Sequence, residues 1–363
     1  MSELLGRRAL NRATLERQLL LRRTSLSALD AVQHLVGLQA QVPANPYTAL
    51  WSRLEGFRPE EVSELLLGRQ LVRVSVMRGT IHLVTADDCL LLRPLVQPIL
   101  TAELRRHRDL SPKLDGVDLA PVLAFARPLL EAPRTGPQLR EALAARFPRL
   151  DPAALAYACR CQLALVQVPP RGLWGRTGQV TSTTAETWLG HTLVADPSLD
   201  DVVLRYLAAF GPASVADVTT WSRLAGLREV VERLRPRLRT FRDERGRELF
   251  DVPDAPRPAP DTPAPVRFLP EYDNVLLSHA DRSRVISKDD RAALSRAGGV
   301  GYGSVLVDGF ARAVWRIEDG ALVVSHLPLP KRALAAVAAE GRRLLRFLAS
   351  DRVEDDVRLV SLD

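Results

Sequence analysis

The sequence predicts an α+β fold of three tandem winged helix-turn-helix units followed by a C-terminal β-rich, barrel-like domain. The first observation is a pattern that occurs three times, in which segments of helical hydrophobic spacing precede two strands. The second is a proline-rich stretch, residues 253–265 with six prolines, that separates this repeat from a run of short strands. We therefore place four units, at 1–112, 113–194, 195–264 and 265–363.

The first unit contains four segments with helical spacing and then a two-stranded ribbon. The helices are expected at 9–22, 25–40, 44–55 and 59–67, and the strands at 71–76 and 81–84. Thr85 and Asp88 have the spacing of a capping box, which predicts a further long helix towards the basic run that begins at Arg105.

The later units are predicted in the same way. Helices are expected at 118–131, 134–147 and 151–164 in the second unit, and at 200–210, 211–224 and 227–234 in the third. Arg134-Thr135-Gly136-Pro137 is expected to start the helix through Phe147, Asp151-Pro152 to cap the helix through Ala164, and Gly211-Pro212-Ala213-Ser214 to cap the helix through Leu224. The corresponding ribbons are expected at 165–168 with 173–180, and at 238–241 with 248–252. The C-terminal domain should hold strands at 304–307, 311–317, 321–325 and 357–360, with hairpin turns at Asp308-Gly309 and Asp319-Gly320 and a helix at 332–348.

The charge balance makes nucleic acid a plausible partner. The net charge is +7, the sequence pI is about 9.8, and all but three of the 50 basic residues are arginines. Arginine binds phosphate with a fork of donors, and a basic protein attracts nucleic acid. A GC-rich coding genome would also give this arginine bias, so the charge alone proves nothing.

Other function classes find no support in the sequence. No apolar run approaches the length of a membrane span, and no signal peptide is recognisable. The three cysteines, Cys89, Cys159 and Cys161, fit neither a zinc site nor a disulfide framework. No phosphate loop, nucleophile elbow or metal-binding motif occurs, so we expect no metal, no cofactor, no membrane association and a cytoplasmic, nucleoid-associated location.

The stretch from His34 to Tyr47 contains the most informative residues of the chain. Gln39 and Gln41 flank one alanine, and Pro43 and Pro46 prevent a helix from continuing unbroken. We expect the two amides to lie at the end of a helix, where they can project into a cleft. Taken alone, two glutamines are more often solvated surface residues than functional ones.

These residues resemble a known family. The run from His34 to Gln41, the Asn45-Pro46-Tyr47 sequence and the segment from Met77 to Val84 are similar to the AlkZ-like family of bacterial DNA glycosylases. Further similarities are Phe210 to Asp217 with Trp221, and Leu269 to Asp273 followed by Asp281-Arg282. The resemblance implies tandem winged helices and a Gln-x-Gln catalytic motif, formed here by Gln39 and Gln41. Where the family motif ends in aspartate it goes with broader substrates and unhooking of interstrand cross-links. Gln41 therefore favours the branch that gives self-resistance to DNA-alkylating natural products.

Uncharged glutamines are chemically sufficient for one class of substrate. A purine alkylated at nitrogen 7 or 3 is cationic and leaves as a neutral base, so its departure needs no general acid. The remaining task is to hold a water molecule and to place negative dipoles near an oxocarbenium-like sugar. An undamaged purine would still require protonation, so such a site selects damaged DNA.

The resemblance also suggests which residues surround the glutamines. Arg78, Thr80, His82 and Asn45 are expected as neighbours that orient the amides or hold a phosphate. Candidate contacts to the DNA backbone are arginines in turns, wings and basic runs, namely Arg105, Arg106, Arg171, Arg176, Arg245, Arg247 and Arg282. We expect a monomeric, monofunctional glycosylase acting on bulky alkylpurines in duplex DNA. The alternatives are a non-enzymatic winged-helix transcriptional regulator, which would be expected to dimerise, and a protein-interaction scaffold.

Overall fold

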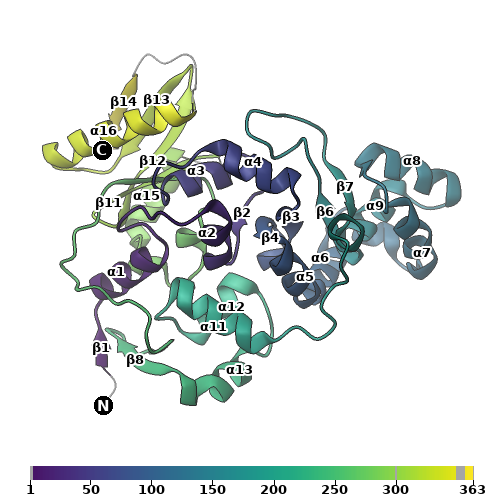
Figure 1. The fold of residues 1–363 in the computed structure, drawn as a ribbon, viewed down its shortest axis with the longest axis horizontal. Helices are drawn as coiled ribbons and strands as arrows, with labels where there is room; N and C mark the ends of the chain where they lie inside the picture. Colours follow the sequence, from purple (N-terminus) through teal and green to yellow (C-terminus); the bar gives the residue numbers. More distant parts are fainter. Residues whose placement is uncertain (1–2, 299–300, 349–355, 363) are drawn as a thin grey trace.

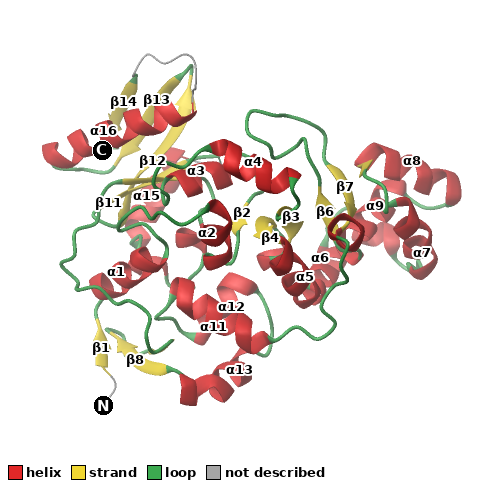
Figure 2. Ribbon diagram, viewed as in Figure 1, coloured by secondary structure: helices red, strands yellow, loops and turns green. Residues whose placement is uncertain are grey.

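The computed structural model describes residues 3–298, 301–348 and 356–362, and it has the mixed α+β character that the sequence predicts. Within these residues the strands form a six-stranded, a five-stranded and a three-stranded sheet. The six-stranded sheet extends from the centre of the molecule towards a group of helices at one end of the long axis (Figures 1 and 2). Other helices pack around the sheet along its length.

The N-terminal part differs from the prediction at the glutamines. Its elements are β1 (Glu3–Leu5), α1 (Arg7–Arg17), α2 (Ala28–His34), β2 (Leu38–Gln39), α3 (Asn45–Trp51), α4 (Pro59–Leu67), β3 (Leu71–Ser75), β4 (Ile81–Thr85), α5 (Ala86–Leu95) and α6 (Gln97–Arg106). The expectation of one helix over 25–40 is wrong, because α2 ends at His34. Val36 and Gly37 then take positive φ angles of 54° and 91°, which turn the chain into β2.

The first two predicted ribbons belong to one sheet. It also includes β5 (Arg134–Thr135), β6 (Leu165–Gln167) and β7 (Thr181–Thr184), in the order β2-β4-β3-β6-β7-β5. The expected strand at 173–180 is wrong. That segment is a loop that returns over the first unit, where Trp174 packs on Tyr47 at a ring distance of 4.9 Å and the Tyr47 hydroxyl donates to the Gly172 carbonyl.

The helices of the second and third parts begin where their capping residues predict. The second part holds α7 (Ala120–Leu129), α8 (Gly136–Arg146), α9 (Pro152–Gln162) and α10 (Ala185–Leu189), and the third holds α11 (Leu199–Phe210), α12 (Val215–Ser222), α13 (Leu227–Leu234), β8 (Arg239–Asp243) and β9 (Glu248–Asp251). The side chains of Thr135, Asp151 and Ser214 each accept a hydrogen bond from the first turn of α8, α9 and α12, respectively. Unexpectedly, β1 extends the third ribbon by pairing in parallel with β8.

The C-terminal part contains an open sheet covered by helices. Its elements are β10 (Arg267–Leu269), α14 (Asn274–Leu277), α15 (Lys288–Gly298), β11 (Gly303–Val307), β12 (Phe310–Glu318), β13 (Ala321–His326), α16 (Lys331–Leu348) and β14 (Val357–Ser361). Both Asp-Gly hairpin turns are confirmed, with positive φ at each residue. The strands run in the order β10-β11-β12-β13-β14, so among the described residues the sheet ends in two edges and does not close into the expected barrel.

Two buried ion pairs fasten segments that are far apart in sequence. Arg53, just after α3, forms two hydrogen bonds of 2.9 Å with the carboxylate of Asp273, and both side chains are fully buried. Arg17 at the end of α1 makes the same kind of pair with Asp251 of β9. Each pair joins the N-terminal part to a later part, so these bonds help to set where the third and C-terminal parts lie.

Breaking one of these pairs on one side should be costly. Replacing Asp273 by Asn leaves the Arg53 guanidinium buried without its counter-charge, and we expect the free energy of unfolding to fall by about 3–5 kcal/mol. Urea denaturation followed by tryptophan fluorescence measures this change. The control is Arg22→Ala, which removes the exposed Arg22–Glu16 pair and should cost at most about 1 kcal/mol. Equal effects of the two variants would contradict the assigned role.

Candidate active site

The backbone of β2 places Gln39 in the site. β2 pairs antiparallel with β4, so that Gln39 lies opposite His82 and the buried Leu38 lies opposite Leu83. The Ala40 N–H then donates to the Ile81 carbonyl at 2.8 Å, which continues the pairing past the strand. Backbone pairing at Leu38 and at Ala40 therefore fixes the position of Gln39 independently of its side-chain contacts.

Arg78 links Gln39 to the rest of the site. Its Nη2 donates to Gln39 Oε1 at 2.8 Å and lies 3.3 Å from His82 Nε2, and its Nη1 donates to the Trp221 carbonyl at 3.0 Å. Arg78 lies in the tight turn between β3 and β4 with a φ of 59°. One guanidinium thus joins the glutamine of the first part to helix α12 of the third.

His82 is a neutral acceptor that orients Arg78. Its Nδ1 lies 2.9 Å from the Thr80 carbonyl and donates to it, so Nε2 has a lone pair for the Arg78 guanidinium. Burial, reinforced by the charge of Arg78, lowers the pKa of His82 to about 3. At neutral pH the imidazole is uncharged and its single N–H is bonded to the Thr80 carbonyl, so His82 is not a general acid for a substrate. Thr80 contributes its carbonyl, and its hydroxyl donates to the Met77 carbonyl.

Gln41 and Asn45 have different surroundings. Gln41 is exposed, and its Oε1 accepts a hydrogen bond from the Ile81 N–H at 3.3 Å. Asn45 is buried at the start of α3, where its amide donates to the Glu271 carbonyl at 2.7 Å. Gln39 and Gln41 therefore both contact the β4 edge, whereas Asn45 ties α3 to the C-terminal part.

Arg78 and two arginines whose charges act on it have no carboxylate partner within 4 Å in the described part of the chain. They are Arg78, Arg223 and Arg282. Burial, followed by the charges of Arg223 and Arg282, lowers the pKa of Arg78 to about 10. Arg223 also donates to the Arg78 carbonyl at 3.3 Å. Their mutual repulsion makes this a favourable place for an anion such as a phosphate.

A second group of arginines lines a cleft of about 490 Å³ on the side of Gln41. We call it the arginine cleft, and its basic residues are Arg73, Arg93, Arg134, Arg140, Arg160 and Arg171. No acidic residue lines it, and none of the six forms an ion pair within the described residues. Arg73 and Arg93 instead donate to the Ala40 and Leu163 carbonyls. The Nε of Arg73 is buried without a partner.

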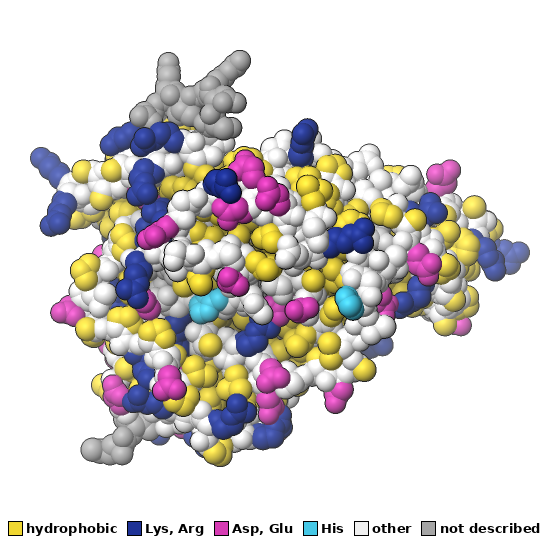
Figure 3. Space-filling model, in the orientation of Figure 1, with side chains coloured by type: hydrophobic (Ala, Val, Ile, Leu, Met, Phe, Trp, Pro, Cys, Tyr) yellow, Lys and Arg dark blue, Asp and Glu magenta, His cyan; other side chains and the backbone are white. Residues whose placement is uncertain are grey.

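The arginines expected from the sequence are distributed over several surfaces. Arg171 lines the arginine cleft, Arg282 lies near Arg78, and Arg105, Arg106 and Arg176 are exposed on α6 and on the 173–180 loop. Arg245 and Arg247 both pair with Asp281, and Arg247 also pairs with Asp243. On the face shown in Figure 3, basic and acidic side chains lie close together over much of the surface, so unpaired clusters are distinctive.

Sequence reasoning missed Arg223 and most of the arginine cleft. Arg73 could have been noticed from the sequence, because a charged residue within the alternating strand 71–76 is unusual in a mostly buried sheet. Arg223 gave no signal, because its position at the end of α12 only acquires meaning once α12 packs against the Met77–Gly79 turn.

The described residues show neither a metal site nor a membrane-spanning helix. They contain no group of three or more His, Cys, Asp and Glu side chains arranged to hold a metal ion. No helix among them is both long enough and apolar enough to cross a membrane.

Comparison with known proteins gives a consistent result. A model of the family described as DNA glycosylase AlkZ-like matches residues 32–347. An interstrand DNA cross-link repair glycosylase from Streptomyces sahachiroi is 27% identical over 366 aligned positions, which cover 91% of this chain and 94% of the relative. The solved structure of Streptomyces sahachiroi DNA glycosylase AlkZ superposes with a TM-score of 0.79 at 25% identity, covering 98% of this chain and 99% of that one.

The neutral state of His82 has a consequence for acid stability. Its pKa of about 3 in the folded protein lies below the ordinary value of 6.5, so the unfolded chain binds a proton that the native one excludes between these pH values. The contribution of His82 to the free energy of unfolding is fully present above pH 6.5. On acidification towards pH 3 this contribution should fall by up to about 1.4 kcal/mol per pH unit. His82→Gln should make the loss between pH 6 and pH 4.5 shallower in urea denaturation. An unchanged slope would contradict the assignment.

Proposed function

The chain belongs to the AlkZ-like family of DNA glycosylases, and from this premise we propose that Gln39 and Gln41 catalyse hydrolysis of the N-glycosidic bond of purines alkylated at nitrogen 7 or 3 in duplex DNA. The observation that carries the proposal is the Arg78–Gln39 hydrogen bond beside Gln41 on the same strand edge. This hydrogen bond fixes the orientation of the Gln39 amide next to Arg78, an arginine without a carboxylate partner in the described part of the chain, which supports a catalytic role for that amide.

The proposed chemistry uses amide oxygens as dipoles. The alkylated base leaves as a neutral molecule, so the catalytic side chains have only to position water and stabilise the sugar cation. Arg78 occupies one lone pair of Gln39 Oε1 and fixes the plane of the amide, which leaves the second lone pair for a water molecule. Gln41 Oε1 is oriented by the Ile81 N–H in the same way.

The arginines then have a specific electrostatic role. Positive charge beside an oxocarbenium-like sugar would raise the barrier unless it were neutralised. A phosphate of the damaged strand held by Arg78, Arg223 and Arg282 would supply that neutralisation and position the sugar near Gln39. Substrate binding and catalysis are thus coupled, because the charged site becomes compatible with a sugar cation only when DNA occupies it.

The remaining finer proposals follow from the same premise. We propose that the helix groups with their ribbons act as winged helices around the duplex, and that a monomer suffices, because one chain supplies every residue of the site. A role in self-resistance to a DNA-alkylating natural product fits the Gln-x-Gln motif. The relative from Streptomyces sahachiroi is by name a cross-link repair enzyme. We therefore add purine-linked interstrand cross-links to the proposed substrates, which widens the expectation drawn from Gln41.

A single-turnover assay tests the assignment. The protein should release 7-alkylguanine from a duplex and leave an unbroken abasic strand, with the same rate in EDTA. Gln39→Ala and Gln41→Ala should each slow excision by about 10-fold or more, which corresponds to about 1.4 kcal/mol in barrier. The affinity for lesion DNA should change little. Gln33→Ala, on the exposed surface of α2, is the matched control. Excision at the wild-type rate by both motif variants would refute the catalytic role.

The arginine cleft should contribute to the salt dependence of binding. Arg140 and Arg160 are exposed and lack carboxylate partners in the described chain, so each can neutralise a phosphate and release a counterion. Arg140→Gln and Arg160→Gln should each weaken DNA binding and reduce the slope of log affinity against log salt by about 0.9. Arg358→Gln removes an arginine already paired with Asp356 on β14 and should leave the slope unchanged. Fluorescence anisotropy measures these slopes, and parallel lines for all variants would argue against phosphates in the cleft.

A further inference from the structure

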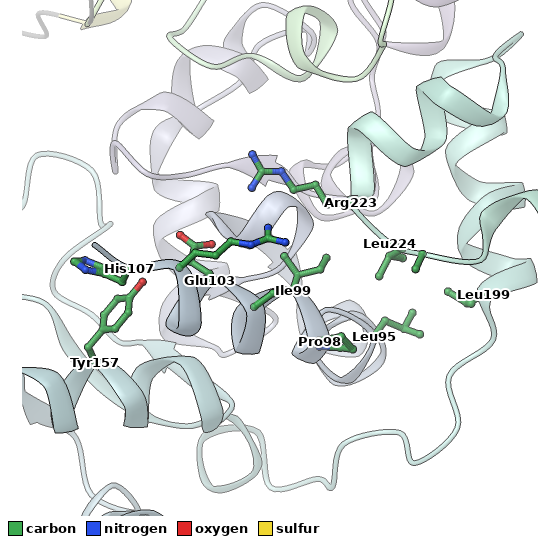
Figure 4. Close-up of a pocket in the computed structure, with 12 residues that line it drawn as sticks. Leu95, Pro98, Ile99, Glu103, His107, Tyr157, Leu199, Arg223 and Leu224 are labelled. Carbon is green, nitrogen blue, oxygen red and sulfur yellow. The ribbon is translucent and has the colours of Figure 1, made fainter. Parts of the chain in front are cut away.

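Two large apolar side chains, Val42 and Tyr272, are exposed beside the loop that carries the two glutamines. Each side chain belongs to a residue that is 38% exposed. The groove of about 630 Å³ along α6 lies on the Arg78 side of the site, because its lining residue Arg223 donates to the Arg78 carbonyl (Figure 4). Val42 and Tyr272 line neither that groove nor the arginine cleft, so the pair is a separate feature of the surface.

Asn45 joins these two residues. Its backbone N–H donates to the Val42 carbonyl at 3.1 Å, and its side-chain amide donates at 2.7 Å to the carbonyl of Glu271, the residue before Tyr272. Val42 and Tyr272 are thus connected through one buried asparagine. Since Val42 follows Gln41 directly, the pair adjoins the end of the loop at which Gln41 lies.

The backbone that follows Tyr272 is held by buried bonds. Asp273 forms the ion pair with Arg53 described above, and the amide of Asn274 donates to the Gly37 carbonyl at 2.7 Å. Gly37 comes two residues before the first glutamine. The segment that carries Tyr272 is therefore bonded to the chain on both sides of the glutamine loop, and its position relative to that loop is fixed.

The backbone of Tyr272 itself is strained. Its φ is 61°, in the left-handed region that residues with a bulky side chain rarely adopt. Such a conformation persists only where the surroundings impose it, and it is common at binding sites. A glycine would adopt this φ at no steric cost. The presence of a partly exposed aromatic ring in its place indicates that the ring has a use.

The chemistry of the pair suits a nucleobase. Every base has a flat π face that can stack on an aromatic side chain, and apolar side chains of DNA-binding proteins can enter the base stack. A hydrogen bond to the Glu271 carboxylate, followed by burial, raises the pKa of Tyr272, so the phenol is neutral at physiological pH. A neutral ring with a carboxylate beside it offers a phosphate little attraction, whereas its face remains suitable for stacking.

On the basis of the proposed function, we propose that Tyr272 stacks on a nucleobase beside the damaged nucleotide, with Val42 packed against the same base. The ring would replace the stacking partner that this base loses when the damaged nucleotide moves towards the glutamines. Tyr272 then holds the duplex in position relative to Gln39 and Gln41, and it takes no part in breaking the bond.

A duplex that contains a tetrahydrofuran abasic-site analogue tests this proposal without any excision. The missing base leaves a gap that a stacking ring can fill at little unstacking cost. The wild-type protein should therefore bind this duplex at least about 5-fold tighter than the matched intact duplex in fluorescence anisotropy. Tyr272→Gly should abolish the preference, whereas Tyr272→Phe keeps the ring and should preserve it within about 2-fold. Val42→Ser should reduce it.

Further variants separate stacking from effects on the fold. Tyr272→Leu keeps an apolar side chain on the same backbone but cannot stack, so it should lose the preference as Tyr272→Gly does. Asp319→Gly is the control, because it relieves a similar φ of 50° at an exposed hairpin of the C-terminal sheet and should leave both affinities unchanged. Urea denaturation shows whether each variant is folded. Single-turnover excision of 7-methylguanine should slow about 10-fold in Tyr272→Leu and stay within about 2-fold in Tyr272→Phe.

The outcomes distinguish this inference from the proposed function. The stacking role would be overturned if the wild-type protein had no preference for the abasic duplex, if folded Tyr272→Leu kept that preference, or if it weakened binding to both duplexes equally. Slower excision in Tyr272→Leu with an unchanged preference would also overturn it. If the wild-type protein excised no alkylpurine, but Tyr272→Leu lost the preference and Tyr272→Phe kept it, the stacking role would stand and the proposed catalysis would fall.

Discussion

The geometry of the site depends on a backbone pairing only two residues long. Gln39 lies beside Arg78 and His82 because Leu38 and Gln39 pair with Leu83 and His82 of β4. Successive residues of a strand face opposite sides, so a slip of one residue would turn Gln39 away and expose Leu38. The turn at Gly37 depends on a glycine, because a Cβ there would approach Val84 Cγ1 to 2.7 Å and φ is 91°. Burial of Leu38 opposes a shift of the register.

The arginines of this chain act in two ways that can be told apart by their partners. Arg17 and Arg53 are buried against carboxylates and fasten distant segments, so their charge is already balanced. Backbone carbonyls accept hydrogen bonds from most of the unpaired arginines around Arg78 and in the arginine cleft, and these bonds orient the side chains without balancing their charge. These arginines are Arg73, Arg78, Arg93, Arg134, Arg171 and Arg223. In the function proposed above, the phosphate backbone of DNA would be the counter-charge for this second group. On that proposal the fold supplies the orientation of these arginines and the substrate supplies the neutralising charge.

Features of this structure that are set by neighbouring residues could be predicted from the sequence, and features set by distant ones could not. The caps at Thr135, Asp151 and Ser214 and the turns at Asp308 and Asp319 depend on a few adjacent residues, and all were expected. The merging of two ribbons through β3 and β6 and the loop that carries Trp174 depend on contacts across about 100 residues. Motif resemblance singled out Gln39 and Gln41, but the hydrophobic spacing extended the preceding helix to residue 40 and so included Gln39, because the pairing with β4 is not a property of the stretch itself. Their catalytic role remains a prediction.

The parallel pairing of β1 with β8 bears on how the chain is made. Glu3 pairs with Phe241, so β1 leaves the ribosome 238 residues before its partner strand does. At translation rates of about 5–20 residues per second, this interval is roughly 10–50 s. During that time β1 has no strand to join, and its hydrogen-bonding edge is open to other chains. The third part of the molecule can complete its sheet only after most of the chain has been synthesised, which makes the N-terminal segment a late participant in folding.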